Sequence, residues 1–201
     1  MYDERLKIAY DKSDEVIKEL DLDSDEIVAT AEVIDYIKKH TNCKTIIVKS
    51  MSFKDLDAAK DCGAMMLVKV KESENVQAPL LEAFIILNSD HAYDFQRFSL
   101  LHELGHLMTL NTSEASMETV DENKYIVSTH IDYQITRIKE DEYKNDKYLL
   151  DEQIANIFAL RVLMPTKQFY SVAKKYGEIS KIAKFFGVTN DAVISRMMIG
   201  A

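Results

Sequence analysis

Three observations predict an α+β fold for this chain of 201 residues. Apolar residues recur at helical spacing near the N-terminus, around residue 100, and from residue 148 onward. Short segments rich in aliphatic and β-branched residues lie between residues 45 and 87, as expected of strands. The hydrophobic fraction of 47% is enough for a proper core in one domain. These features together predict a small mixed or antiparallel sheet flanked by helices.

The N-terminal segment is predicted to form two helices, at residues 3–20 and at about residues 25–40. Asp23 and Glu26 resemble an N-terminal capping pair for the second helix. The expected buried stripe of that helix is Ile27, Ala31, Ile34 and Ile37. Residues 1–35 hold 12 acids and 4 bases, so this segment carries −8 of the chain's net charge of −9. A solvated acidic face on a packed helical layer is the favoured interpretation, and docking of a basic partner is the alternative.

The predicted sheet consists of strands at residues 45–51, 64–71 and 84–87. A short helix is expected from Ser52 to about Cys62, with Gly63 as its C-terminal stop. A further strand or hairpin is expected at residues 125–138, where apolar and polar residues alternate. This last segment could cover a cleft as a flap or be a surface insertion without a role.

A helix is predicted at residues 94–110, with Asp94 as its N-cap. Its expected apolar stripe is Phe95, Phe98, Leu101, Leu104 and Met108. Gly105 is a poor helix former, costing about 1 kcal/mol relative to Ala, so its position in the middle of the helix indicates close packing there.

The same helix carries the pattern HExxH. His102 and His106 lie one turn apart, so both imidazoles share a face and can bind one metal ion. Glu103 lies about 100° round the helix from His102, near enough to act on a water at that metal without binding the metal. The alternative is a pair of surface histidines in an ordinary helix. The pattern favours a zinc hydrolase.

A catalytic zinc site usually has three protein ligands, so one more is needed. No histidine follows His130 and no cysteine follows Cys62, which leaves a downstream carboxylate. A second helix is predicted at residues 148–164, closed by Pro165. Glu152 lies in its first turns and Asn156 follows one turn later, which suits a ligand and an amide that holds an imidazole. The residues alone leave Glu152 open as ligand or surface residue, with Asp151 as the nearest competitor.

Residues 179–197 indicate a helix, a turn that contains glycine, and another helix, which resembles a DNA-reading helix-turn-helix. Residues 166–201 hold six bases and two acids, a balance that permits phosphate contacts. The whole molecule is acidic, however, and the segment has no dense basic face. A structural appendage is therefore favoured over a DNA reader.

Two blocks of sequence resemble the ImmA/IrrE family of metallopeptidases. Residues 97–106 read RFSLLHELGH, and residues 152–159 and 163–165 read EQIANIFA and LMP. The family pattern is R-F-[ST]-x-x-HE-x-x-H, followed by E-x-x-A-[ND]-x-F-A and L-M-P. The strand of residues 84–88, FIILN, also fits the family, and the likeness covers about residues 64–200. Arg161 departs from the pattern, because a neutral or acidic residue is common there, and the stretch between the blocks is long.

The resemblance implies a zincin-like metallopeptidase core, with an active-site helix, a second ligand-bearing helix and a C-terminal helical pair. It makes Glu152 the favoured third zinc ligand beside His102 and His106, and Glu103 the catalytic base. No further cofactor is expected. Bound zinc would lower the pKa of its water from 15.7 towards about 7. The oxyanion would need one more donor, and the sequence does not choose among His130, Tyr125, Tyr133 and Tyr143.

The expected function is a zinc-dependent endopeptidase. The resemblance implies that its substrate is a regulatory protein, often a helix-turn-helix repressor encoded near it on a phage or mobile element. A catalytically silent zinc-stabilised binding protein and a DNA-binding regulator are the alternatives. The presence of Glu103 favours the enzyme, because a scaffold needs no general base. Nucleic acid is not expected as a partner, and the sequence does not indicate an oligomeric state.

The predicted organisation has three parts: an acidic helical segment at residues 1–42 packed on the core, a metallopeptidase core at residues 43–165, and a helix-turn-helix-like appendage at residues 166–201. Residues 1–20 are charged throughout, unlike a signal peptide, and no apolar run reaches the length that crosses a bilayer. Cys43 and Cys62 lack metal-binding spacing and are expected to be free thiols. A cytoplasmic location is the expectation.

Overall fold

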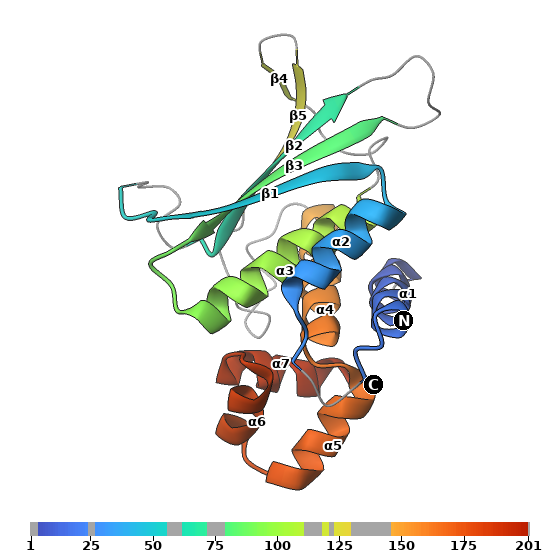
Figure 1. Ribbon diagram of the computed structural model, residues 1–201, viewed down its shortest axis with the longest axis vertical. Coiled ribbons are helices and arrows are strands. Elements are labelled where there is room, and N and C mark those ends of the chain that lie inside the picture. The colour runs from blue at the N-terminus through green and yellow to red at the C-terminus, as the bar shows by residue number, and fades with distance from the viewer. Residues whose placement is uncertain are drawn as a thin grey trace.

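A computed structural model describes residues 4–23, 27–55, 62–71, 79–110, 118–120, 123–129 and 146–200. Its strands are β1 (Cys43–Met51), β2 (Ala64–Lys71), β3 (Leu80–Asn88), β4 (Glu118–Val120) and β5 (Asn123–Thr129). Its helices are α1 (Glu4–Glu19), α2 (Thr30–His40), α3 (Tyr93–Thr109), α4 (Asp146–Leu163), α5 (Thr166–Tyr176), α6 (Ile179–Phe186) and α7 (Asn190–Ile199). The predicted α+β class with a small mixed sheet is confirmed (Figure 1).

The sheet has the strand order β1-β3-β2-β5-β4. The pair β1–β3 is parallel, with Ile47 opposite Phe84, and the other three pairs are antiparallel. Side chains alternate along the central strands, as expected of a sheet that covers a core on one face. The inward residues of β2 and β3 are buried: Ala64, Met66, Val68, Val70, Leu81, Ala83, Ile85 and Leu87.

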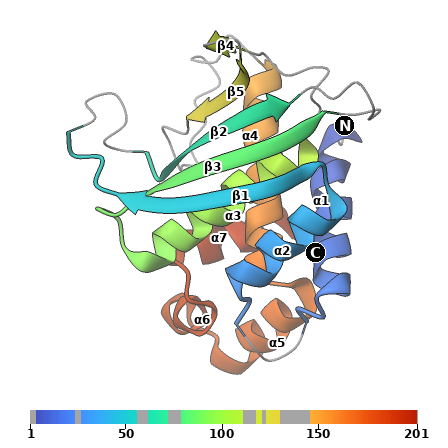
Figure 2. The same cartoon turned by 45° about the horizontal axis from the view of Figure 1, so that its top comes forward.

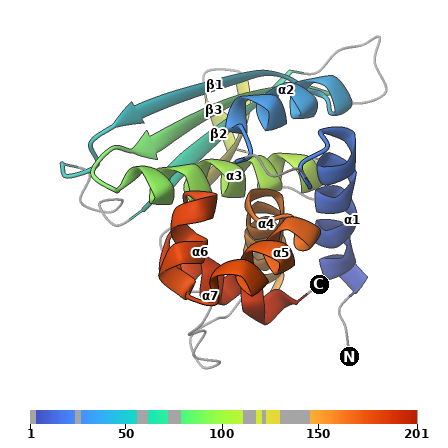
Figure 3. The same cartoon turned by 60° about the horizontal axis from the view of Figure 1, so that its bottom comes forward.

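The helices lie on one side of this sheet. α2 and α3 lie next to the sheet, and α4 and the C-terminal helices follow beyond α3 (Figures 2 and 3). α3 is therefore an interior helix, buried from Arg97 to Met108 with the exception of partly exposed His106. The sequence predicted an apolar stripe, and the surrounding layers bury the other faces as well. Of the helices in the described ranges, none is long and apolar enough to span a membrane.

The predicted start of the second helix is wrong. α2 begins at Thr30 with Ala29 as its N-cap, and Ile27 is 55% exposed rather than part of the buried stripe. The chain before α2 is held in a non-helical form, because Arg97 Nη2 donates a hydrogen bond of 2.6 Å to the carbonyl of Val28.

Other N-terminal expectations are also corrected. Asp23 forms an ion pair of 3.3 Å with Lys167 instead of capping α2. The buried residues of α2 are Val33, Tyr36 and Ile37, so of the expected stripe Ile37 is buried, Ile34 is partly buried and Ala31 is exposed.

Two further boundaries differ from the predictions. α3 begins at Tyr93 with Ala92 as its N-cap, so Asp94 lies inside the first turn, where its Oδ1 accepts from the Phe95 amide. Ser52 is not helical, and most of the short helix expected after it falls on residues 56–61, outside the described residues. Of the strand expected at residues 125–138, the described part is β5, which pairs with β4 as a hairpin.

The C-terminal region contains one helix more than the predicted pair. α5 follows Pro165 directly and ends at Tyr176, and the capping residue Gly177 has a φ of 68°, in the left-handed region that glycine adopts readily. α6 and α7 match the expected helix, turn and helix, with Gly187 at φ 61° in the turn. The division into parts at residues 42/43 and 165/166 stays a prediction.

Candidate metal centre

The two histidines of the HExxH pattern face each other on the C-terminal half of α3. Their Nε2 atoms lie 3.1 Å apart, and the exposed side-chain fractions are 3% for His102 and 14% for His106. The expectation that one turn of helix brings both imidazoles to one point is confirmed. The burial follows from the position of α3 between the sheet and α4.

Glu152 reaches this point from α4. Its carboxylate oxygens lie 3.3 Å from His102 Nε2 and 3.3 Å from His106 Nε2. One ligand atom from each of the three residues lies within 4.8 Å of the others. Asp151, the competing candidate, is exposed and does not belong to this group. Two residues of α3 and one of α4, 46 positions apart along the chain from His106 to Glu152, therefore form one polar cluster.

The cluster has the dimensions of a small tetrahedral metal site. Zinc binds imidazole nitrogen and carboxylate oxygen at about 2.0–2.2 Å, so neighbouring ligand atoms of a tetrahedral site lie about 3.3–3.5 Å apart. The two Nε2 atoms lie 3.1 Å apart, and each of them lies 3.3 Å from a different oxygen of the Glu152 carboxylate, which is close to that value for each pair. Two imidazoles and a carboxylate are also a donor set that zinc prefers. The residues present fit a zinc ion.

Asn156 orients the first histidine. Its Oδ1 lies 2.8 Å from His102 Nδ1, and because a carbonyl oxygen only accepts, Nδ1 carries the proton. The lone pair of the ring is then on Nε2, which faces Glu152 and His106. The sequence predicted that an amide one turn after Glu152 would hold an imidazole, and the structure has this contact.

Glu103 is fully buried beside His102 and is not one of the three clustered residues. Buried carboxyl groups are uncommon in proteins and occur with partners or at functional sites. Its position on the same turn as His102 matches the position expected for a base that acts next to the metal.

Gly105 allows α3 and α4 to approach each other at the site. A Cβ on Gly105 would lie 3.1 Å from both the Cα and the carbonyl oxygen of Ala155, and 3.1 Å from Phe158 Cδ1. Such distances are tighter than ordinary van der Waals contact, so the helices could not pack this closely around a larger residue. The close packing predicted from a glycine in mid-helix is confirmed.

Arg97 is an organising residue to which the sequence analysis gave no role. Its Nη1 donates to the carbonyls of Phe186, at 2.5 Å, and Gly187, at 3.2 Å, at the C-terminal end of α6. Burial lowers the pKa of its guanidinium. With the bond to Val28, this side chain joins α3 to the α6–α7 turn and to the segment before α2. The sequence signal for this residue is its place at the start of the RFS block, five residues before His102.

The oxyanion donor stays unassigned. His130, Tyr133 and Tyr143 lie outside the described residues, and of Tyr125 only the backbone is described, in β5.

Comparison with known proteins gives one match. The family model of the IrrE N-terminal-like domain, a family of peptidases, matches residues 61–198. Members of this family are typically metal-dependent. The matched range includes α3, α4 and the C-terminal helices, and it leaves out α1, α2 and β1. Neither the curated proteins nor the solved structures include a match to this chain.

Proposed function

The chain belongs to the IrrE N-terminal-like family of peptidases, and from this premise we propose that it is a zinc-dependent endopeptidase with a zincin-like core. The observation that carries the proposal is the convergence of His102, His106 and Glu152 to 3.1–3.3 Å, with Glu103 buried beside them. In this proposal α3 is the active-site helix, and α4 supplies the third zinc ligand.

The proposed site residues have two separate roles. His102, His106 and Glu152 hold the metal ion, and Glu103 transfers protons. A divalent ion held by the cluster would act as a Lewis acid on water and on the substrate carbonyl. Asn156 fixes the tautomer of His102, so its Nε2 is ready to bind a cation without prior loss of a proton. Glu152 supplies a negative charge that offsets part of the charge of the ion.

Glu103 acts as general base and then as general acid. It accepts the proton of the attacking water and delivers it to the nitrogen of the leaving amine, a role that typically contributes about 10²–10⁴-fold in rate. The choice of an enzyme over a silent zinc scaffold rests on this residue, since a scaffold needs ligands but no base.

The proposed substrate is a regulatory protein, in particular a transcriptional repressor of the helix-turn-helix type. This part of the proposal rests on the family resemblance alone, as does the association with phage or mobile elements. The cytoplasmic location also stays a prediction.

The C-terminal helices support a structural role better than DNA reading. Arg196 lies on α7, the helix that would read DNA, but it is 1% exposed. Its Nε donates to the Met164 carbonyl at 3.0 Å and its Nη2 to Thr166 Oγ1 at 2.9 Å. The exposed apolar residues of α7 are Ile194, Met197 and Met198, and such side chains do not bind phosphate.

The test compares wild-type protein with Glu103→Gln, both loaded with zinc, on peptides that span helix-turn-helix repressors, with new termini identified by mass spectrometry. We expect Glu103→Gln to retain about one zinc per chain and to lose about 10²–10⁴-fold in cleavage rate. Asp151→Asn is the matched control, because Asp151 is exposed, and it should retain both zinc and cleavage. Undiminished cleavage by Glu103→Gln would exclude Glu103 as the base.

A further inference from the structure

The face of α4 opposite Glu152 is covered by the N-terminal helix. Leu150, Ile154, Ile157 and Arg161 recur at spacings of four, three and four, so they form one stripe along α4. All four are buried, with exposed fractions of 4–8%. The three apolar residues of the stripe form a cluster with Ala9 of α1, against which Leu6 and Tyr10 of α1 and Ile199 of α7 also pack. This cluster is separate from the main core of the protein.

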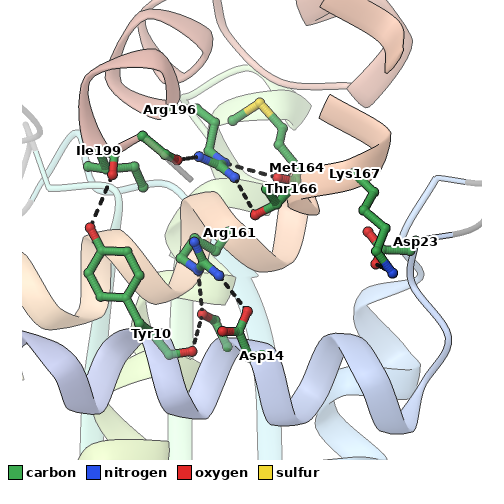
Figure 4. A network of polar contacts seen from close by, with 11 residues as sticks. Tyr10, Asp14, Asp23, Arg161, Met164, Thr166, Lys167, Arg196 and Ile199 are labelled. Atoms are coloured by element: carbon green, nitrogen blue, oxygen red, sulfur yellow. Dashed lines mark hydrogen bonds and ion pairs between the residues drawn. The ribbon is translucent and has the colours of Figure 1, made fainter. Parts of the chain in front are cut away.

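Arg161 fastens the two helices together at the end of this stripe. Its Nε donates to Ser13 Oγ at 2.8 Å, and its Nη2 forms an ion pair with Asp14 Oδ1 (Figure 4). Its guanidinium also lies over the ring of Tyr10, 4.8 Å from the ring centroid. Tyr10 in turn donates to the carbonyl of Ile199 at 3.1 Å. Because its three partners Tyr10, Ser13 and Asp14 all lie on α1, the buried Arg161 side chain fixes both the position of α1 along α4 and the rotation of α1 about its own axis.

The stripe and the metal-facing residues lie on opposite sides of α4. Ile154 is two residues from both Glu152 and Asn156, which is about 200° around a helix of 3.6 residues per turn. α4 makes its extensive contacts with α3 on one side and with α1 on the other. At Gly105, α3 and α4 are so close that not even a Cβ atom would fit between them without a shift. α1 therefore closes the side of α4 on which the helix could move away from the histidines.

Small movements of α4 matter at the cluster. Glu152 lies at 3.3 Å from each imidazole, and a metal ligand must keep its distance to within about 0.2 Å. Glu152 also lies in the first half of α4, the half that Leu150 and Ile154 attach to α1. A helix without support on that side would lose the alignment of Glu152 and Asn156 together.

We propose that α1 is a buttress for the metal site, and that Arg161 is the positioning residue through which α1 holds Glu152 within reach of the ion. This inference rests on the proposed zinc site. α1 lies outside the matched range of residues 61–198, so the buttress is a part of this chain that the family model does not include. The acidic N-terminal segment then has a function in metal binding rather than only a solvated face.

The test measures zinc affinity of the full chain by competition with a chromophoric chelator. Arg161→Met keeps an unbranched side chain that can fill much of the same space, and it removes the bonds to Ser13 and Asp14. We expect it to bind zinc up to about 10-fold more weakly than wild type, the lower end of the range for loss of an outer-shell partner, because Arg161 acts on Glu152 only through the position of α4. Cobalt absorption spectra give a second readout, and we expect those of Arg161→Met to move towards those of Glu152→Ala, which lacks the third ligand.

Substitutions of two adjacent acidic residues of α1, Asp14 and Glu15, provide a milder test and its matched control. Asp14 contacts α4, whereas Glu15 accepts from Tyr36 of α2 at 3.0 Å. Asp14→Asn should weaken zinc binding in the same direction as Arg161→Met but less, and Glu15→Gln should leave it unchanged. Asp14 has an exposed side-chain fraction of 62%, so its replacement is compatible with folding even if Arg161→Met fails to fold.

A general loss of stability has to be separated from a loss of positioning. Val33→Ala shortens a buried side chain of α2 that belongs to the main core and not to the α1–α4 cluster, and it should lower the urea midpoint of the apoprotein without a change in zinc affinity. Wild-type affinity in both Arg161→Met and Asp14→Asn, or an equal loss in Val33→Ala, would overturn the inference. Failure of wild-type protein to bind zinc would instead overturn the proposed function on which the inference rests.

Discussion

The two faces of α4 differ in the kind of contact that each makes. The face towards α3 is polar at its centre, where Glu152 and Asn156 meet the imidazoles of His102 and His106 at 2.8–3.3 Å. The face towards α1 is apolar over about two turns, from Leu150 to Ile157, and is followed one turn later by a buried cation, Arg161. α4 thus carries the polar residues of the proposed metal site on one face and the residues that pack against α1 on the other.

This difference indicates how contacts on one face of a helix can hold side chains in position on the opposite face. The polar contacts across the α3–α4 interface contribute little net stability, because water competes for the same groups. The apolar contacts on the α1 side stabilise by burial. Substitutions on the two sides should therefore have distinct signatures: a change in metal affinity with little change in apoprotein stability on the α3 side, and changes in both on the α1 side.

The largest effect is expected at Glu152, the proposed third ligand. Glu152→Ala should weaken zinc binding by more than the 10- to 100-fold typical of an outer-shell partner, because it removes a charged ligand. The unfolding free energy of the apoprotein should change little. Zinc content after dialysis against a chelator, together with urea unfolding, measures both quantities. Full zinc occupancy in this variant would remove Glu152 from the site.

A smaller effect is expected one turn further along α4. Asn156→Ala removes the acceptor of His102 Nδ1 and should weaken zinc binding by about 10- to 100-fold. Asn156→Asp is the matched control, since a carboxylate also accepts from Nδ1, and it should retain most of the affinity. Equal affinity in wild type and Asn156→Ala would show that the contact does not orient the ring.

The contact between the helices should respond to a single methyl group. Gly105→Ala gains about 1 kcal/mol of helix propensity, but the added Cβ meets the backbone of Ala155, and overpacking typically costs about 1–3 kcal/mol. We expect a net destabilisation of about 1 kcal/mol and a parallel loss of zinc affinity, because α4 must move away from α3. Urea unfolding and chelator competition test this. If Gly105→Ala were more stable than wild type and had unchanged zinc affinity, the α3–α4 interface would be shown to accommodate the added methyl group.

The smallest effect is expected on the outer side of α1. Hydrogen bonds from Lys12 and Tyr36 lower the pKa of Glu15 below its usual 4.5, so its carboxylate stabilises the fold above that pH and loses this contribution as the pH falls through the lowered value. Glu15→Gln should cost less than about 1 kcal/mol at pH 7, since the group is largely exposed. Thermal unfolding between pH 3 and pH 7 should show the two proteins converging at low pH. A difference that grows as the pH falls would contradict this sign.

The sequence predicted most of the elements because their periodicities are local. The strands at residues 64–71 and 45–51 and the helices at residues 94–110 and 148–164 agree with β2, β1, α3 and α4 to within a few residues. The start of α2 was missed because it depends on Arg97, which is distant in sequence and binds the Val28 carbonyl. α5 was not anticipated, although Pro165 and Gly177 mark its two ends.

The candidate site was predictable to a different extent for each residue. The pair His102 and His106 follows from helical geometry alone. Glu152 could not be chosen from local pattern, because an acid near a helix start is common, and the family resemblance was needed to favour it. The roles of Arg97 and Arg161 depend on which segments meet in three dimensions, and a single sequence does not contain that information.

The central claim is that α3 and α4 together hold one zinc ion, and zinc K-edge X-ray absorption of the purified protein tests it most directly. The account predicts two imidazole nitrogens at about 2.0–2.1 Å and a carboxylate oxygen at about 2.0–2.2 Å, with no sulfur in the first coordination sphere. Loss of one oxygen in Glu152→Ala should be visible in the same spectrum. A sulfur ligand at about 2.3 Å, or a spectrum that His102→Ala leaves unchanged, would contradict the claim.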